Sequence, residues 1–265
     1  MKRTGISTII FDHINYKHMH NLKFYIALLA TAFTTASFAQ KIYTVDHFDK
    51  VIISPFIQVT FVEGNEETVT IENCNVETEK LHIEVNGKTL RIYLEGAKDV
   101  PKNEKDYSNG YTEKHALYHG TVVTAVVTYR KLNELSLRGE ETQVCKSVLQ
   151  GDYFRLKIYG TSKVILNEVD LNECHATIYG ESTLNIKAGR IDFQHYIVYG
   201  ESTINSLGIS GNNSKLVAYG EADFFVNVSN EINITAFGEA SLHYKGTPVI
   251  YKGIHIGDMK IDKMD

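Results

Sequence analysis

Two rows of side chains recur along the second half of the sequence at a nearly constant spacing, and both could carry chemistry. The aromatic row consists of Tyr159, Tyr179, Tyr199, Tyr219 and Phe237. The acidic row follows it two residues later and consists of Glu181, Glu201, Glu221 and Glu239. Exposed aromatic rings bind sugar rings or apolar partners, but they also stack on one another in a plain structural role. The aromatic row is therefore predicted to be either a ligand-binding surface or a structural stack, of which the stack is the simpler interpretation.

The acidic row would suit a hard cation, because carboxylate oxygens are ligands that Ca²⁺ prefers. Carboxylates on neighbouring strands, about 4.8 Å apart, repel one another by roughly 1 kcal/mol in water. They must therefore splay into solvent or be bridged by a cation. The sequence lacks the Asp- and Gly-dense loops of calcium-binding β-helices. A metal site on the acidic row remains a speculative prediction, and we expect no cofactor.

Signatures of common enzymes are absent from the sequence, which has no G-x-S-x-G, no H-E-x-x-H and no P-loop. A polysaccharide-cleaving β-helix would need acidic residues clustered with Arg or Lys in a groove. The nearest acidic candidates occupy scattered places: Asp152, Asp170, Asp192 and Asp223. The histidines His175, His195 and His243 are interpreted as out of register and as ordinary half-buried residues. We therefore predict a protein that is not an enzyme.

A repeated segment must position both rows. It reads LKIYGTSKVIL, ATIYGESTLNI, YIVYGESTINS, LVAYGEADFFV and ITAFGEASLHY, with central glycines 20, 20, 20 and 18 residues apart. These glycines are Gly160, Gly180, Gly200, Gly220 and Gly238. Large apolar residues alternate with polar ones in each copy, which is typical of a strand with one buried face. The Gly and the small residue that follows it on the inner face let the strand bend sharply.

About twenty residues per repeat are too few for a βαβ unit, which needs about 30, but they suit one coil of a parallel β-helix. We therefore predict an all-β protein built as a right-handed parallel β-helix with coils of about 20 residues. An up-and-down antiparallel barrel is the main alternative, although it would lose the stacking that makes an identical motif useful.

The chain before the regular repeats, residues 40–134, is predicted to be irregular and could be sandwich-like. Asn86-Gly87 lies between two apolar runs, which is a strong signal for an antiparallel hairpin. Lys98–Gly110 is polar and charged without an apolar period, and it is interpreted as a long surface loop.

Regular coils are predicted over residues 135–247. They begin with a degenerate copy in which Glu141 stands where the small inward residue belongs, so this first coil is expected to be irregular. Residues 248–265 are predicted to cap the stack with two short strands, Val249–Lys252 and Ile254–Ile256, and a charged tail.

The first 39 residues are predicted to be a signal peptide outside the fold. Leu22–Phe33 is an apolar run too short to span a bilayer, which takes about 20 residues, and Ser37–Ala39 resembles a cleavage site before Gln40. A retained membrane anchor is the alternative, and Met19 is a candidate for the true first residue. The mature chain, 40–265, is expected to form a single domain and to be exported to the periplasm, the outer surface or the extracellular medium.

Charge and cysteine content exclude two further classes. The net charge is −5 and the basic residues are scattered, which argues against a nucleic-acid partner. The three cysteines, Cys74, Cys145 and Cys174, are odd in number and widely spaced, unlike a disulfide framework. Cys145 and Cys174 are expected on adjacent coils. A disulfide between them and a pair of buried free thiols are therefore both left as alternatives.

The order of these motifs resembles the family of putative autotransporter adhesins with the head GIN domain. The resemblance rests on Phe48–Ser54 (FDKVIIS), the strand at Phe56–Gly64, the hairpin at Asn86–Leu90 and KLNEL at Lys131–Leu135, followed by the apolar-x-apolar-x-Gly-x-Ser repeats. It covers about residues 44–260. It implies an exported bacterial β-helical protein of adhesin type, and it supplies no catalytic residues.

These features together predict an exported, non-catalytic binding protein that presents a repetitive surface for adhesion or attachment to a surface glycan or protein. A polysaccharide-active β-helix enzyme and a purely structural envelope protein are the alternatives. No membrane-spanning segment is expected after signal cleavage. The open end of a β-helix can pair with another chain, so a homo-oligomer is a further alternative to a monomer.

Overall fold

The computed structural model describes residues 40–108 and 111–265 of the chain. The predicted signal peptide, its cleavage site and the alternative start at Met19 lie outside the described residues. Within the described ranges, no helix is long and apolar enough to cross a membrane.

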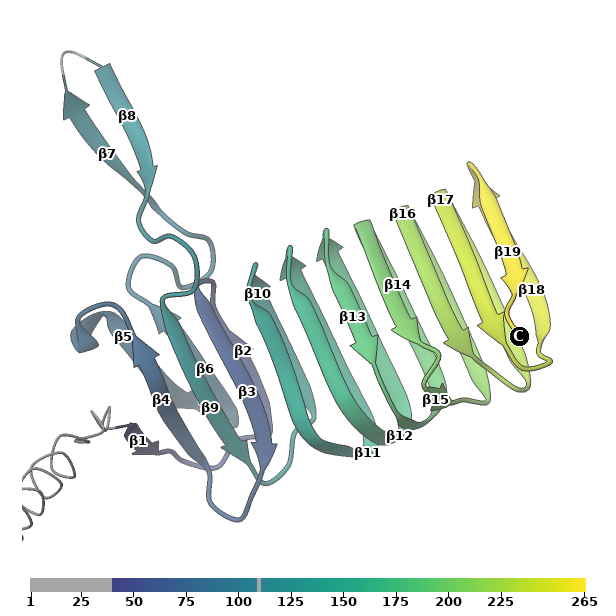
Figure 1. Ribbon diagram of the computed structural model, residues 1–265, viewed down its shortest axis with the longest axis horizontal. Helices are drawn as coiled ribbons and strands as arrows, with labels where there is room; N and C mark the ends of the chain where they lie inside the picture. Colours follow the sequence, from purple (N-terminus) through teal and green to yellow (C-terminus); the bar gives the residue numbers. More distant parts are fainter. Residues whose placement is uncertain (1–39, 109–110) are drawn as a thin grey trace, which may run out of the picture. The chain divides into compact units, whose positions relative to one another are not determined.

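Two groups of strands follow one another along the chain (Figure 1). The first group is β1 (Lys41–Thr44), β2 (Lys50–Ile53), β3 (Ile57–Glu63), β4 (Thr68–Cys74), β5 (Leu81–Asn86), β6 (Thr89–Leu94), β7 (Asn103–Ser108), β8 (Tyr111–Ala116) and β9 (Val123–Tyr129), with a 3₁₀ turn at Thr78–Lys80. The second group is β10 (Glu134–Gly139), β11 (Thr142–Gly160), β12 (Lys163–Gly180), β13 (Thr183–Ile186), β14 (Gly189–Ser206), β15 (Ile209–Ser210), β16 (Asn213–Asn227), β17 (Glu231–Lys245), β18 (Val249–Ile256) and β19 (Met259–Lys263).

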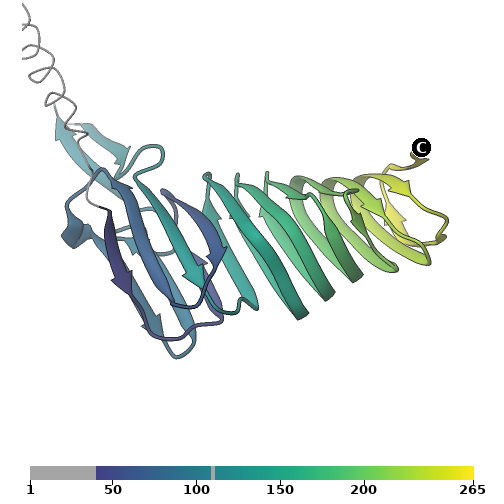
Figure 2. The same ribbon diagram turned by 60° about the horizontal axis from the view of Figure 1, so that its bottom comes forward.

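The second group forms a parallel β-helix of about 20-residue coils, which confirms the predicted class and rules out the antiparallel barrel. Each coil is hydrogen-bonded to the next. Figure 2 shows the strands of successive coils side by side. The central glycines are in register from coil to coil: Gly139, Gly160, Gly180, Gly200, Gly220 and Gly238. The apolar residues of each repeat fill the interior, as their alternation predicts.

The glycine column is required by the backbone. Gly180, for example, has a φ of 119°, a region that L-residues with a Cβ rarely adopt. A Cβ added there would overlap the carbonyl oxygen of Gly160 in the preceding coil. The strand therefore bends at these positions and neighbouring coils approach closely, in agreement with the prediction from the Gly-small pair.

A column of buried serines holds the coils together beside this bend. The Oγ of Ser182 donates to the carbonyl oxygen of Gly160 at 2.9 Å and accepts the backbone N–H of Ser162 at 3.0 Å. Ser202 repeats the same pair of bonds one coil later. The hydroxyl of Ser182 thus gives the N–H of Ser162 a partner and adds a second donor to the carbonyl of Gly160, which also accepts the N–H of Glu181.

The N-terminal strands join the first coils through parallel pairs, β2 with β6 and β10 and β3 with β9 and β11. The antiparallel hairpin predicted at Asn86-Gly87 is confirmed by the pairing of β5 with β6. Gln143 completes the junction between β3 and β11. Its buried amide accepts the N–H of Val59 at 2.9 Å and donates to the carbonyl of Ile57 at 2.8 Å, as a backbone segment would.

Two predictions about irregular segments are wrong. The expected loop at Lys98–Gly110 contributes β7, which pairs with β8 in a separate antiparallel hairpin. The expected charged tail forms β19, and the two predicted C-terminal strands are the single strand β18. Neither segment shows enough apolar alternation to predict a strand. Both nevertheless form strands, because they hydrogen-bond to a neighbouring strand.

The three cysteines are free. Cys145 is in register with Leu166, whereas Cys174 is in register with Phe154 and Gln194, so these two thiols lie in different columns. The alternative of a bridge between them is therefore wrong.

Candidate binding surface

The aromatic row forms one continuous stack. Adjacent ring centres are 5.0, 4.8, 4.8 and 5.2 Å apart, and adjacent ring planes differ by 2 to 4°. The three central rings, Tyr179, Tyr199 and Tyr219, are 41, 38 and 42 % exposed. The parallel coils bring these rings together because each lies one strand spacing from the next in register.

This stacking decides which ring surface a partner can reach. A sugar ring that packs on an aromatic side chain needs a free ring face. Both faces of the three central rings are covered by the rings of the neighbouring coils. The surface that stays accessible consists of ring edges and tyrosine hydroxyls, so the row is a rigid ridge with a regularly spaced hydroxyl edge.

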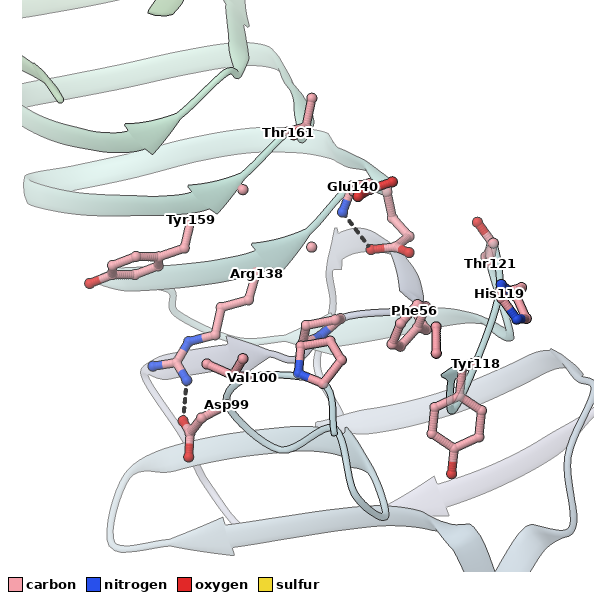
Figure 3. Close-up of a pocket in the computed structure, with 17 residues that line it drawn as sticks. Phe56, Asp99, Val100, Tyr118, His119, Thr121, Arg138, Glu140, Tyr159 and Thr161 are labelled. Atoms are coloured by element: carbon pink, nitrogen blue, oxygen red, sulfur yellow. Dashed lines mark hydrogen bonds and ion pairs between the residues drawn. The ribbon is translucent and has the colours of Figure 1, made fainter. Parts of the chain in front are cut away.

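A cation covers the N-terminal end of the aromatic row. Arg138 is in register with Tyr159, and its guanidinium carbon is 5.5 Å from the ring centre. The same guanidinium forms an ion pair with Asp99 (Figure 3). Asp99 also accepts a hydrogen bond from Arg91 at 2.6 Å. The hydrogen bond from Arg91 and, to a smaller extent, the one from Arg138 lower the pKa of the Asp99 carboxyl.

An open pocket of about 810 Å³ begins at this end of the row, which we call the end pocket (Figure 3). Its walls are mostly apolar, with Phe56 and Tyr118 in ring contact at 5.6 Å. Polar groups at its rim include His119, Glu140 and Thr161. The volume and the mixture of apolar walls with a few polar groups are typical of small-molecule sites.

Glu141 lies in the wall of the end pocket and is buried, at the position where later coils carry a serine. Burial raises the pKa of its carboxyl, and hydrogen bonds from the backbone N–H groups of Glu141, Glu140 and Phe56 oppose this rise. Phe56 has a φ of 69°, an uncommon backbone conformation for a bulky side chain. The first coil is thus closed by a carboxyl group in place of a hydroxyl, next to a strained backbone position.

The acidic row lines a shallow polar groove of about 310 Å³ together with serine and threonine side chains of the same coils. The parallel register brings Glu201, Glu221 and Glu239 side by side. In the part of the chain that the structure describes, no group of three His, Cys, Asp or Glu side chains is arranged to hold a metal ion. The geometry favours carboxylates that splay into solvent, and metal binding by the acidic row stays a prediction.

Three of the four scattered acidic candidates make surface contacts. Asp170 and Asp192 bind the guanidinium of Arg190 at 2.9 and 2.6 Å, and Asp152 accepts from Asn172 at 2.8 Å. Asp223 instead lines the groove of the acidic row.

The prediction that the histidines are out of register is wrong for His175 and His195. They are in register, with ring centres 4.9 Å apart, because their spacing equals one coil. Burial is the main cause that lowers the pKa of His195, and the nearby His175 and Lys215 lower it further. Sequence reasoning also missed the end pocket, whose walls come from five separate stretches of the chain.

Comparisons with known proteins agree with this architecture. Three crystal structures of similar fold come from Bacteroides fragilis (a putative adhesin, TM-score 0.68, 17 % identity), Parabacteroides distasonis (a putative lipid binding protein, TM-score 0.60, 18 %) and Parabacteroides merdae (a putative adhesin, TM-score 0.59, 17 %). They cover 85, 85 and 86 % of this chain and 96 % of each of theirs. No curated protein matches.

The model of one protein family matches residues 47–248, which is most of the chain and includes all the regular coils. The description of that family is "Putative auto-transporter adhesin, head GIN domain". This agrees with the resemblance of the sequence motifs. The chain therefore belongs to this family of head GIN domain proteins.

Proposed function

We propose that this protein is an exported, non-catalytic binding protein that attaches to a surface glycan or protein through the outer face of its β-helix. Membership of an adhesin-type family supports the general class. The observation that carries the proposal is the aromatic row, a rigid ridge of exposed tyrosine edges along consecutive coils. Tyrosine combines a large apolar body with a polar tip at low entropic cost, which suits a recognition surface.

The stacking geometry narrows the mode of attachment. Because the ring faces are covered, the partner would rest on ring edges and bond the hydroxyls. These recur at the ring spacing of about 4.8 Å. A partner with its own regular polar repeat, such as an extended glycan or a β-strand edge, matches this spacing best.

The test is a binding screen of the protein against polysaccharides and surface proteins, with two matched variants. The triple variant Tyr179→Phe, Tyr199→Phe, Tyr219→Phe keeps the stacked rings and removes the hydroxyls. The double variant Tyr199→Ala, Tyr219→Ala removes the ridge itself. Saturable binding that both variants lose, with circular dichroism unchanged, supports attachment through the hydroxyl edge.

The other outcomes separate the alternatives. Binding that survives both variants would move the site away from the aromatic row. Absence of binding throughout would favour a structural envelope protein, and release of reducing sugar from a polysaccharide would favour the enzyme.

A second candidate function is the binding of a small amphipathic molecule in the end pocket, which the apolar walls and the 810 Å³ volume favour. An anionic naphthalene dye is a suitable probe, because its fluorescence reports contact with accessible apolar surface. Thr161→Trp would fill the pocket mouth and should abolish dye binding, whereas Thr203→Trp on a later coil should leave it unchanged.

A further inference from the structure

The last coil exposes an unusual amount of apolar side chain. Four large apolar residues on β18 are exposed to 57, 52, 67 and 65 %: Val249, Tyr251, Ile254 and Ile256. Most exposed apolar residues on a protein surface are isolated, whereas these lie on one short strand. A surface of this kind is typical of an interface.

A bulge places all four side chains on the same outer face. Val249 and Tyr251 are in register with Glu231 and Asn233 of β17. The register then shifts between Ile234 and Ala236, so that β18 gains one residue and Ile256 comes into register with Phe237.

Without this shift, Ile254 and Ile256 would be in register with the inward-facing positions of β17. Bulges often blunt an exposed strand edge. Here the bulge has the opposite effect on the side chains, because it turns two large apolar residues outward.

The same coil leaves backbone groups available for pairing. Among the described strands, β18 and β19 each pair with β17 alone. Their outer edges therefore carry N–H and C=O groups that a further strand can bond.

We propose that two copies of this chain join end to end through β18 about a two-fold axis. An antiparallel pair of β18 strands centred between Lys252 and Gly253 places Val249 opposite Ile256 and Tyr251 opposite Ile254 of the second copy. Residues opposite each other in an antiparallel pair face the same side, and the bulge is what gives these residues a common side. The apolar surface of the strand is therefore complementary to itself.

An interface of this type is isologous, because the same surface of both copies is used. The apolar complementarity of β18 to itself favours a second copy over an unrelated partner.

The first experiment measures the mass of the protein, expressed from the full sequence, by sedimentation over a range of concentrations. The expected result is reversible formation of a dimer. Tyr251→Lys with Ile254→Lys should give a monomer, with circular dichroism showing an intact fold. Ile42→Lys is the matched control, because Ile42 is 64 % exposed on β1, which pairs with β4 in the N-terminal group of strands. A wild-type monomer at every concentration, or a dimer that survives the double change, would overturn the proposal.

The second experiment is cysteine cross-linking, which tests which residues of the two β18 strands lie opposite each other. Tyr251→Cys with Ile254→Cys should form a disulfide between two chains, whereas Tyr251→Cys alone should not, because residue 251 does not face itself. Equal cross-linking of the single and double variants would overturn the register.

Discussion

Arg138 lies in register with Tyr159 and covers the ring face that Tyr179 leaves open. The aromatic row therefore ends at a cation, and this cation is itself held by Asp99. At the other end, Phe237 is in register with the exposed Ile256 of the last coil. The row thus connects the end pocket to the proposed dimer interface.

Arg138→Ala should destabilise the fold by about 1 kcal/mol, the value typical of a cation–π contact at a partly exposed site. Arg138→Lys should lose less, since it keeps the charge but not the fork geometry. The measurement is the free energy of unfolding in urea at neutral pH. Equal stability of wild type and Arg138→Ala would show that the cation does not stabilise the row.

The pH dependence of this site follows from Asp99. Its pKa is lowered in the folded state, so the stability it contributes is present above the unfolded-state pKa and is lost as pH falls through the folded-state pKa. Arg138→Ala should bring the pKa of Asp99 part of the way back to its ordinary range, because Arg91 remains. The stability difference between wild type and Arg138→Ala should therefore shrink on acidification. A difference that grows at low pH would contradict this assignment.

Gly180→Ala should destabilise the protein by about 3 kcal/mol, which combines an unfavourable positive φ with overlap against the carbonyl of Gly160. Gly87→Ala separates the two effects. Gly87 has a φ of 61° but no atom within 4 Å of an added Cβ, so only the conformational cost of about 1 kcal/mol should remain. Thermal unfolding of both variants is the measurement, and similar losses in the two would mean that the coils can move apart at the bend.

The coils could be predicted from the sequence because the 20-residue spacing and the alternation agree at every repeat. Gly160, Gly180 and Gly200 share one structural role, and the period alone reveals it. The same period also indicates that His175 and His195 are in register, because their spacing equals one coil.

The end pocket could not be predicted in this way. Phe56, Asp99, His119 and Arg138 come from separate stretches that share no pattern, and only the folded chain brings them together. The hairpin of β7 and β8 carries no apolar alternation that would indicate strands. The outward position of Ile254 depends on a bulge, which a local sequence pattern does not specify.

Cysteine reactivity should differ sharply between the three thiols. Burial raises the pKa of Cys174 to about 12 and that of Cys145 to about 11, whereas Cys74 is only partly buried. Because the thiolate is the reactive form, an alkylating reagent at pH 8 should modify Cys74 alone in the folded protein and all three in denaturant. Mass spectrometry after a timed reaction provides the measurement. Rapid labelling of Cys174 without denaturant would show that the coil opens there.

The serine column offers a test in both directions. Ser182→Ala removes the hydroxyl that bonds Gly160 and Ser162. It takes the partner from the buried N–H of Ser162, whereas the carbonyl of Gly160 still accepts the N–H of Glu181 at 3.0 Å. We expect a loss of about 1–3 kcal/mol in the free energy of unfolding.

The natural sequence supplies the reverse case, because Ala222 occupies the same column in register with Ser202. Ala222→Ser should be neutral or stabilising, since the new hydroxyl can donate to the carbonyl of Gly200 and accept from the N–H of Ser202. Urea unfolding of the two variants provides the comparison. A loss of stability in Ala222→Ser as large as that in Ser182→Ala would show that side-chain volume, and not hydrogen bonding, governs this column.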